Sequence, residues 1–143
     1  MSLDSTVIQI IVDNAVGVPD FSVLDLTRFS KLESLVIGDN CFSYVTEVKM
    51  VGLKALESVE IGMNSFTQHK NDYGNDSNRH FYLKNCPKLK SLKIGEYSFS
   101  EYTVIEIENV DALEVVEMGD LDDESYNFHG ASLELKSILI HRE

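Results

Sequence analysis

The feature that most constrains the fold of this chain is a repeated segment of the form Leu-x-x-Leu-x-Ile-Gly. Three copies agree at many positions and continue into a small residue and a phenylalanine, and weaker copies open and close the chain. One unit is about 24 residues long, since the copies begin at Val7, Leu32, Leu56, Leu89, Leu113 and Leu135. A unit this short cannot bury its own apolar side, so we expect the units to stack around one continuous core.

A second apolar pattern precedes each copy and predicts a second strand in every unit. Apolar residues or cysteines lie eight, six and three residues before the four central copies: Leu24, Leu26, Phe29, Val48, Met50, Leu53, Phe81, Leu83, Cys86, Ile105, Ile107 and Val110. The first two positions of each set alternate as in a strand with one buried face. We expect the corner after the first strand to use the freedom of glycine at φ > 0, at Gly38, Gly62, Gly95 and Gly119.

The spacing of the copies is irregular at two places. The third interval is 33 residues, and its nine extra residues fall in the polar stretch 67–80, for which we predict a loop that projects from one corner. The last copy, from Leu135, is degenerate, because Asn127 and His129 stand where apolar residues are expected.

These residues resemble a known family. Leu-x-x-Leu-x-Ile is the core of the leucine-rich repeat, the Ile-Gly-x-x-Ser-Phe element is similar to its BspA-like branch, and the connector 85–89 resembles arrays in large repeat proteins of protists. Two departures are the glycine corner in place of an asparagine and the lack of a disulfide-capped flank. The resemblance implies a mostly β solenoid of about six coils, with short strands on two faces and little helix. The resemblance covers about Leu24 to Ile140, and we expect residues 1–143 to form a single domain or a segment of a longer array.

In this family the function is recognition of other macromolecules, generally proteins, by the outward residues of the parallel sheet. Here the candidate partner-binding residues are Ser34, Val36, Ser58, Glu60, Ser91, Lys93, Val115 and Glu117. A merely solvated sheet would also suit small serines and alternating charges, and the opposite sheet offers Lys49, Tyr82 and Glu106. The alternative function is a structural spacer or adhesin segment of a larger repeat protein, which would self-associate through its open ends.

Charge and hydropathy exclude two classes of partner. Lys and Arg number 12 against 24 Asp and Glu, which gives a net charge of −12 and argues against nucleic acid. No apolar run reaches the roughly 20 residues that span a bilayer. The first residues show no secretory signal, which favours the cytoplasm over the cell surface unless a signal was removed.

The sequence predicts neither an enzyme nor a metal or cofactor site. No catalytic motif is visible, and His69, His80, His129 and His141 have no partners at metal-ligand spacing. Cys41 and Cys86 fall in core columns and are interpreted as small buried hydrophobes. Calcium binding by the oxygen-rich stretches 72–78 or 120–124 is a distant alternative, and residues 75–77 form a glycosylation sequon.

Overall fold

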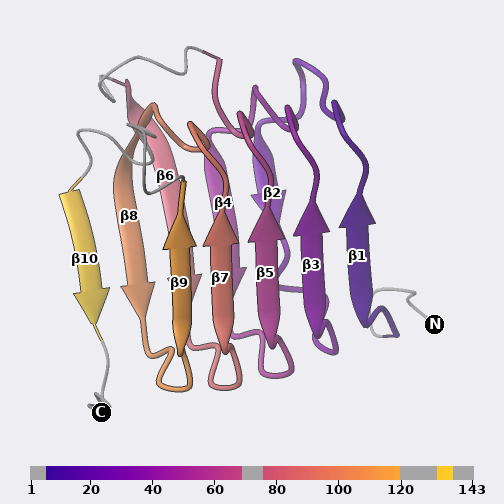
Figure 1. Ribbon diagram of the computed structural model, residues 1–143, viewed down its shortest axis with the longest axis vertical. Helices are drawn as coiled ribbons and strands as arrows, with labels where there is room; N and C mark the ends of the chain where they lie inside the picture. The colour runs from indigo at the N-terminus through magenta and orange to yellow at the C-terminus, as the bar shows by residue number, and fades with distance from the viewer. Residues whose placement is uncertain (1–5, 69–75, 120–131, 137–143) are drawn as a thin grey trace.

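The structure is a computed structural model of the 143-residue chain and describes residues 6–68, 76–119 and 132–136 (Figure 1). These residues form strands, turns and irregular connections, with no helix among them. One sheet contains, in spatial order, β1 (Gln9–Val12), β3 (Ser34–Ile37), β5 (Ser58–Ile61), β7 (Ser91–Ile94) and β9 (Val115–Met118). The second sheet contains β2 (Val23–Asp25), β4 (Glu47–Val51), β6 (Asp76–Lys84), β8 (Tyr102–Glu108) and β10 (Ser132–Lys136).

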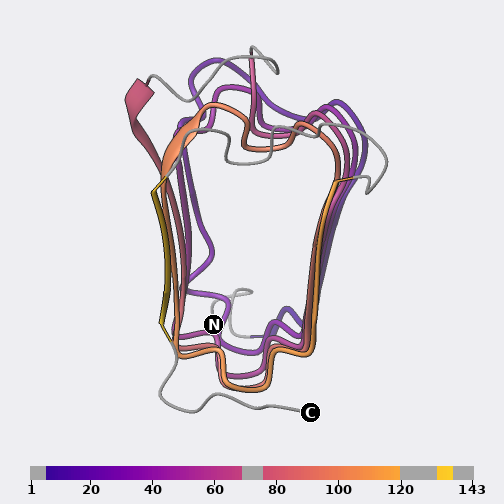
Figure 2. The same cartoon turned by 60° about the vertical axis from the view of Figure 1, so that its left-hand side comes forward.

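The chain passes alternately from one sheet to the other. Neighbouring strands within each sheet are parallel and are two strands apart along the chain. Parallel neighbours cannot be joined by a tight turn, and here the strand in the opposite sheet serves as the crossover. Figure 2 shows the two sheets as two walls connected at both ends. The protein is therefore mostly β, with two parallel sheets that enclose the apolar side chains.

Alternation along each strand decides which side chains enter the core. Leu35 and Ile37 of β3 are buried, whereas Ser34 and Val36 between them remain partly exposed. Of the twelve residues predicted to face inward ahead of the central copies, ten are buried and two, Leu24 and Phe29, are partly buried. The predicted pairing of two strands per repeat, with one apolar face each, is confirmed for these copies.

The reason predicted for the recurring glycines is wrong at three corners. Gly38, Gly62 and Gly95 do not adopt positive φ, and only Gly119 of the four does, at 70°. These three glycines are instead stacked against the backbone of the preceding corner. A Cβ on Gly95 would lie 2.6 Å from the carbonyl carbon of Gly62 and 2.7 Å from the nitrogen of Met63. Glycine is required because adjacent coils approach too closely for a side chain.

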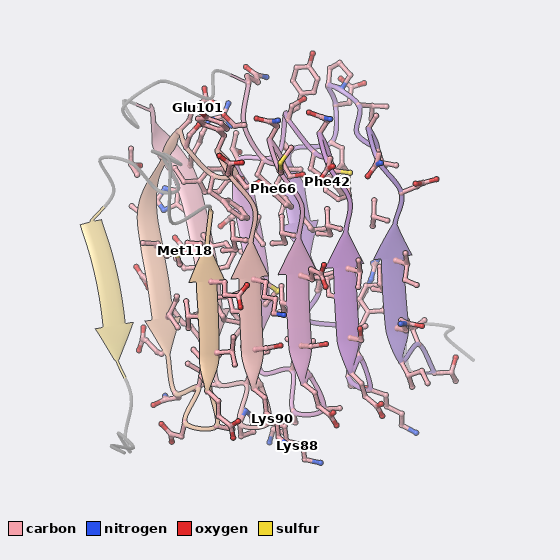
Figure 3. All side chains as sticks on the ribbon, in the orientation of Figure 1. Phe42, Phe66, Lys88, Lys90, Glu101 and Met118 are labelled. Atoms are coloured by element: carbon pink, nitrogen blue, oxygen red, sulfur yellow. The ribbon has the colours of Figure 1, made fainter. Side chains whose placement is uncertain are left out.

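Asparagine and phenylalanine adopt the left-handed backbone at the corners. The residues with φ between 54° and 63° include Asn40, Asn64, Asn85, Asn109, Phe42, Phe66 and Phe99. Asparagine tolerates this conformation, but an aromatic residue is strained there by about 1–3 kcal/mol. Ring packing offsets this strain: the ring centroids are 5.4 Å apart between Phe42 and Phe66 and 4.5 Å between Phe66 and Phe99. Figure 3 shows the first two rings in adjacent corners.

The sheet predicted for the strand that begins at Leu135 in the last repeat is also wrong. Leu135 was expected to open a strand of the first sheet, but β10 joins the second sheet, with Leu133 beside Ile105 and Leu135 beside Ile107. A Leu-x-Leu pair alternates with the period of any half-buried strand, so it fits either sheet. Asn127, His129 and any further strand after residue 136 lie outside the described residues.

The long third interval lengthens both strand β6 and the connection between β5 and β6. Strand β6 begins at Asp76 and has nine residues, and its register against β8 shifts between Asp76 and His80. The predicted loop 67–80 is therefore too long at its end. At its start Thr67 and Gln68 lie outside any strand, as a loop requires, although Thr67 is buried. The stretch 69–75 lies outside the described residues.

Candidate functional site

The predicted binding face is the outer surface of the first sheet. Its eight residues lie on β3, β5, β7 and β9, two on each strand, and the register aligns them in two rows. One row contains Ser34, Ser58, Ser91 and Val115, and the other contains Val36, Glu60, Lys93 and Glu117. All eight side chains are exposed or partly exposed. The fold thus brings together on one surface the residues singled out from the sequence.

A further row of charges, which sequence reasoning missed, lies at the start of the same strands. Glu57, Lys90 and Glu114 are neighbours, because the Lys90 amide donates to the Glu57 carbonyl (2.8 Å) and the Glu114 amide to the Lys90 carbonyl (2.9 Å). Together with Glu60, Lys93 and Glu117 they form three stripes that run along the strands: acidic on β5, basic on β7 and acidic on β9. We call these six residues the charge stripes. Lys88 and Lys90 lie at the start of β7 in Figure 3.

The charge stripes are open to solvent and are not closed into ion pairs. All six side chains are exposed, and the ion pairs of the described ranges do not include any of them. Opposite charges on neighbouring strands attract only weakly where water surrounds them. A signal was present in the sequence, since the residue that follows the opening leucine is charged in every copy from Leu32 onward. These groups remain available to a partner.

The outer face of the second sheet is different, because its charges are largely used within the molecule. Lys84 Nζ lies 2.6 Å from Glu106 Oε1 and 3.2 Å from Glu108 Oε2, and Lys49 Nζ lies 3.7 Å from Glu47 Oε2. The hydrogen bond with Glu106 is the main cause that raises the pKa of Lys84. The outward position of Lys49 and Glu106 was predicted, but Glu47, Lys84, Glu108 and the ion pairs were not.

A shallow hollow on this second face lies beside Tyr82. Its lining includes Asp25, Lys49 and Lys84 as well as the tyrosine. The Tyr82 hydroxyl lies 2.9 Å from His80 Nδ1, and burial followed by the charge of Glu106 raises the pKa of the tyrosine. The hollow is therefore polar and internally bonded, with little unsatisfied chemistry to offer a ligand.

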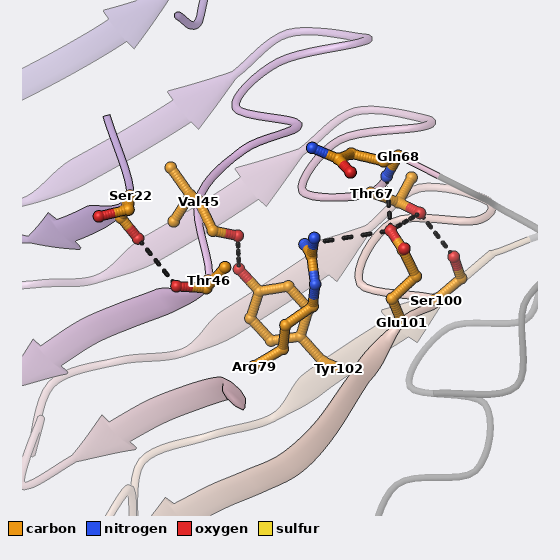
Figure 4. A network of polar contacts seen from close by, with 9 residues as sticks. All are labelled: Ser22, Val45, Thr46, Thr67, Gln68, Arg79, Ser100, Glu101 and Tyr102. Atoms are coloured by element: carbon orange, nitrogen blue, oxygen red, sulfur yellow. Dashed lines mark hydrogen bonds and ion pairs between the residues drawn. The ribbon is translucent and has the colours of Figure 1, made fainter. Parts of the chain in front are cut away.

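A buried polar cluster, also missed from the sequence, lies at the corner that carries the long interval (Figure 4). The Glu101 side chain is 8% exposed, and its Oε1 accepts bonds from Thr67 Oγ1 (2.9 Å) and from the Gln68 amide (2.5 Å). The same oxygen lies 4.0 Å from Nη1 of the buried Arg79. Thr67 also shares a 2.7 Å hydrogen bond with Ser100.

This cluster connects the two ends of the long interval. Thr67 and Gln68 open the stretch 67–80, and Arg79 lies near its end. All three interact with one carboxylate, that of Glu101, which comes from the next repeat. A buried carboxylate requires such compensation. Nearby, the hydroxyl of the buried Tyr102 donates to the Val45 carbonyl at 2.6 Å. The Glu101 carboxylate is thus compensated inside the fold by hydrogen bonds from Thr67 and Gln68, whereas Arg79 Nη1 lies beyond hydrogen-bond distance of it, at 4.0 Å. These contacts indicate a structural role for the cluster.

The cysteines and histidines show no reactive arrangement where the chain is described. Cys41 and Cys86 are buried free thiols, and burial raises the pKa of Cys86, which keeps it protonated. Residues 6–68, 76–119 and 132–136 hold no group of three potential metal ligands. Of the four histidines only His80 is described; the others, the candidate calcium residues 72–75 and 120–124, and the side chains of 76–78 are not.

Comparison with family models, with curated proteins and with solved structures finds no match to this chain. In the described ranges no helix is long and apolar enough to cross a membrane.

Proposed function

We propose that this chain is a leucine-rich-repeat solenoid that recognises another protein through the outer face of its first sheet. The repeat pattern supports the solenoid, because consecutive copies occupy equivalent positions on neighbouring parallel strands. The sixth coil of the predicted array would fall beyond residue 136. Recognition is supported by the exposure of the eight candidate residues, which lie in two rows on neighbouring strands.

The observation that carries this proposal is the set of charge stripes. Three alternating lines of charge lie on β5, β7 and β9 and on the residue before each strand, exposed and without internal ion pairs in the described chain. Strands hold charges in fixed positions, so a partner can match the pattern with little ordering cost. The equivalent groups on the second sheet are paired with one another, which makes that face the weaker candidate.

The pattern also defines the chemistry of the partner. A complementary protein surface places basic groups over β5 and β9 and an acidic group over the central lysines of β7. The chain carries a net charge of −12, so a partner that is basic around this site gains from long-range attraction. Such complementarity determines specificity and association rate more than final affinity.

The test is a pull-down with a charge-swapped variant, Glu60→Lys with Lys93→Glu. The swap leaves the net charge unchanged and reverses the charge of one of the two residues in each of two neighbouring stripes. A matched control, Glu47→Lys with Lys49→Glu, reverses an ion pair on the second sheet. We expect the wild type and the control to retain the same protein and the swapped variant to lose it.

Each alternative outcome is informative. Equal retention by the swapped variant would contradict the assignment of the face, since opposed like charges at an interface cost several kcal/mol. Failure of the wild type to retain a specific protein from any extract that contains basic partners would contradict the recognition function. Circular dichroism of all variants checks that folding is unchanged.

A further inference from the structure

Exposed large apolar side chains are concentrated at the first-repeat end of the structure. Of the ten in the described chain, six lie within residues 8–23: Ile8, Ile11, Val16, Val18, Phe21 and Val23. Ile11 is 66% exposed and Val18 is 58% exposed. Scattered apolar residues need no explanation, but a cluster at one end indicates a surface that is covered by a partner.

The core side of the first repeat is also incompletely covered. Ile10 and Val12 align with Leu35 and Ile37, yet the latter two are each 2% exposed whereas the former are only partly buried. Leu24 of β2 shows the same difference from its neighbour Val48. Equivalent residues in later repeats lie on strands with a neighbouring strand on both sides. In the described part of the chain, β1 and β2 each have a neighbouring strand on one side.

Both sheets end in open strand edges at this repeat. The Ile8 and Val12 carbonyls accept bonds from the next repeat, at Ser34 and Gly38. Because backbone groups alternate in direction along a strand, the amide and carbonyl groups of Gln9 and Ile11 point to the opposite, free side of β1. No hydrogen bond to those groups occurs in the described part of the protein.

Strand β2 repeats this geometry in the second sheet. The Ser22 carbonyl accepts a hydrogen bond from the Glu47 backbone amide, and the Leu26 backbone amide donates to the Lys49 carbonyl at 2.9 Å. The backbone groups of Val23 and Asp25 therefore point to the free edge of β2, which is the terminal strand of its sheet. A partner that pairs with both free edges must itself have two open strand edges, separated by the same distance as β1 and β2.

We propose that this end binds a second copy of the same chain across a two-fold axis normal to the sheets. Such an axis places β1 antiparallel to β1 of the other copy and β2 antiparallel to its equivalent. The separation of the two edges then matches automatically, because both copies have the same fold. The joint would pair the open backbone groups and cover Ile10, Val12 and Leu24. This inference does not depend on the proposed function of the first sheet.

Charge predicts how salt affects this dimer. Residues 6–27 contain three aspartates and no lysine or arginine: Asp13, Asp20 and Asp25. The two-fold axis brings the acidic groups of the two copies near one another, so screening by salt should strengthen association. A complex held by opposite charges would weaken with salt instead.

The experiment is sedimentation velocity of the full chain from low to several hundred micromolar, at low and high salt. We expect the mass to rise to that of two chains, at lower concentration when salt is high. Val18→Asp adds charge to the end, and Ile11→Pro removes an edge amide without affecting the β1–β3 bonds. Each change occurs twice across the joint, so we expect at least about tenfold weaker dimerisation.

A matched control is Met63→Asp, which introduces the same charge at a side chain 43% exposed in a later repeat. It should dimerise like the wild type. A wild type that stays monomeric throughout would overturn the proposal. So would growth beyond two copies, which indicates head-to-tail stacking, or dimers that both end variants leave unchanged. A melting curve for each variant establishes that it folds.

Discussion

Adding a single methyl group at Gly95 tests whether the glycine corners exist because of close stacking. In Gly95→Ala the new Cβ would lie 2.6 Å from the backbone of Gly62, whereas ordinary contacts begin at 3.4 Å. The two corners must therefore separate by about 0.8 Å. Backbone on the other side cannot move away as the end of a flexible side chain could, so the strain is transmitted to the strands.

The cost can be estimated from what the separation disturbs. Overpacking of a tight site costs about 1–3 kcal/mol. The shift also weakens, without breaking, two hydrogen bonds, Gly95 N to Ile61 O (2.8 Å) and Ser98 Oγ to Gly62 O (2.6 Å), at about 0.5 kcal/mol each. We expect a loss of about 2–4 kcal/mol in the free energy of unfolding. This corresponds to a fall of roughly 5–15 °C in Tm.

Gly52 provides the contrasting control. It has φ of 70° and open space where a Cβ would be, so Gly52→Ala should cost only about 1–2 kcal/mol from backbone strain. Asparagine distinguishes the two causes, because it relieves left-handed strain but has the same Cβ. Gly52→Asn should be milder than Gly52→Ala, whereas Gly95→Asn should be at least as damaging as Gly95→Ala.

Urea denaturation of the four variants measures these differences. If Gly95→Ala proved no more costly than Gly52→Ala, or if asparagine rescued position 95, the close-stacking explanation would be refuted. A glycine chosen for positive φ would then be the correct interpretation at both corners.

Three further predictions concern buried polar groups. Ser65→Ala removes a hydroxyl that bridges two corners and should cost about 1–3 kcal/mol in urea denaturation, whereas Ser65→Cys should cost less; equal costs would contradict the bridging role. Glu101→Ala leaves the Arg79 charge buried without its carboxylate and should cost about 3–5 kcal/mol, and a loss below 1 kcal/mol would show that the cluster is dispensable. Burial raises the pKa of Tyr102 well above its usual 10.0, so its contribution is present below pH 10.0 and is lost as pH rises further. Tyr102→Phe should therefore be less stable than wild type at pH 7 by about 1 kcal/mol, with a shallower alkaline decline in melting temperature; parallel pH profiles would contradict this.

Ser65 also shows a contact that alignment of the repeats alone does not reveal. It aligns with Ser98 and with Cys41, the residue interpreted as a small buried hydrophobe. The Ser65 hydroxyl instead donates to the Gly38 carbonyl at 2.8 Å and accepts from the Cys41 amide at 3.1 Å. Cys41 Sγ lies 3.0 Å from the Asp13 carbonyl, in the same bridging position. The column is buried as predicted, but it bonds adjacent repeats through polar contacts.

For the central repeats, the sequence by itself determined two strands per repeat, their alternation between two sheets and the residues on each face. These follow from local periodicity: apolar residues at every second position face inward in any parallel stack, so Glu60 and Lys93 had to lie outward once the copies were aligned. For the same reason the eight candidate face residues could be predicted together. Their role in binding stays a prediction until a partner is tested.

Only the tertiary structure decided what happens between repeats. The closeness of Gly62 and Gly95, the carboxylate of Glu101 beside Thr67, and the pairing of Leu135 with Ile107 all join residues 28 to 34 positions apart. Local pattern cannot distinguish a glycine needed for its φ from one needed for close contact, or assign a Leu-x-Leu pair to one of two sheets. Those outcomes depend on register and on the distance between coils, which only the stacked chain determines.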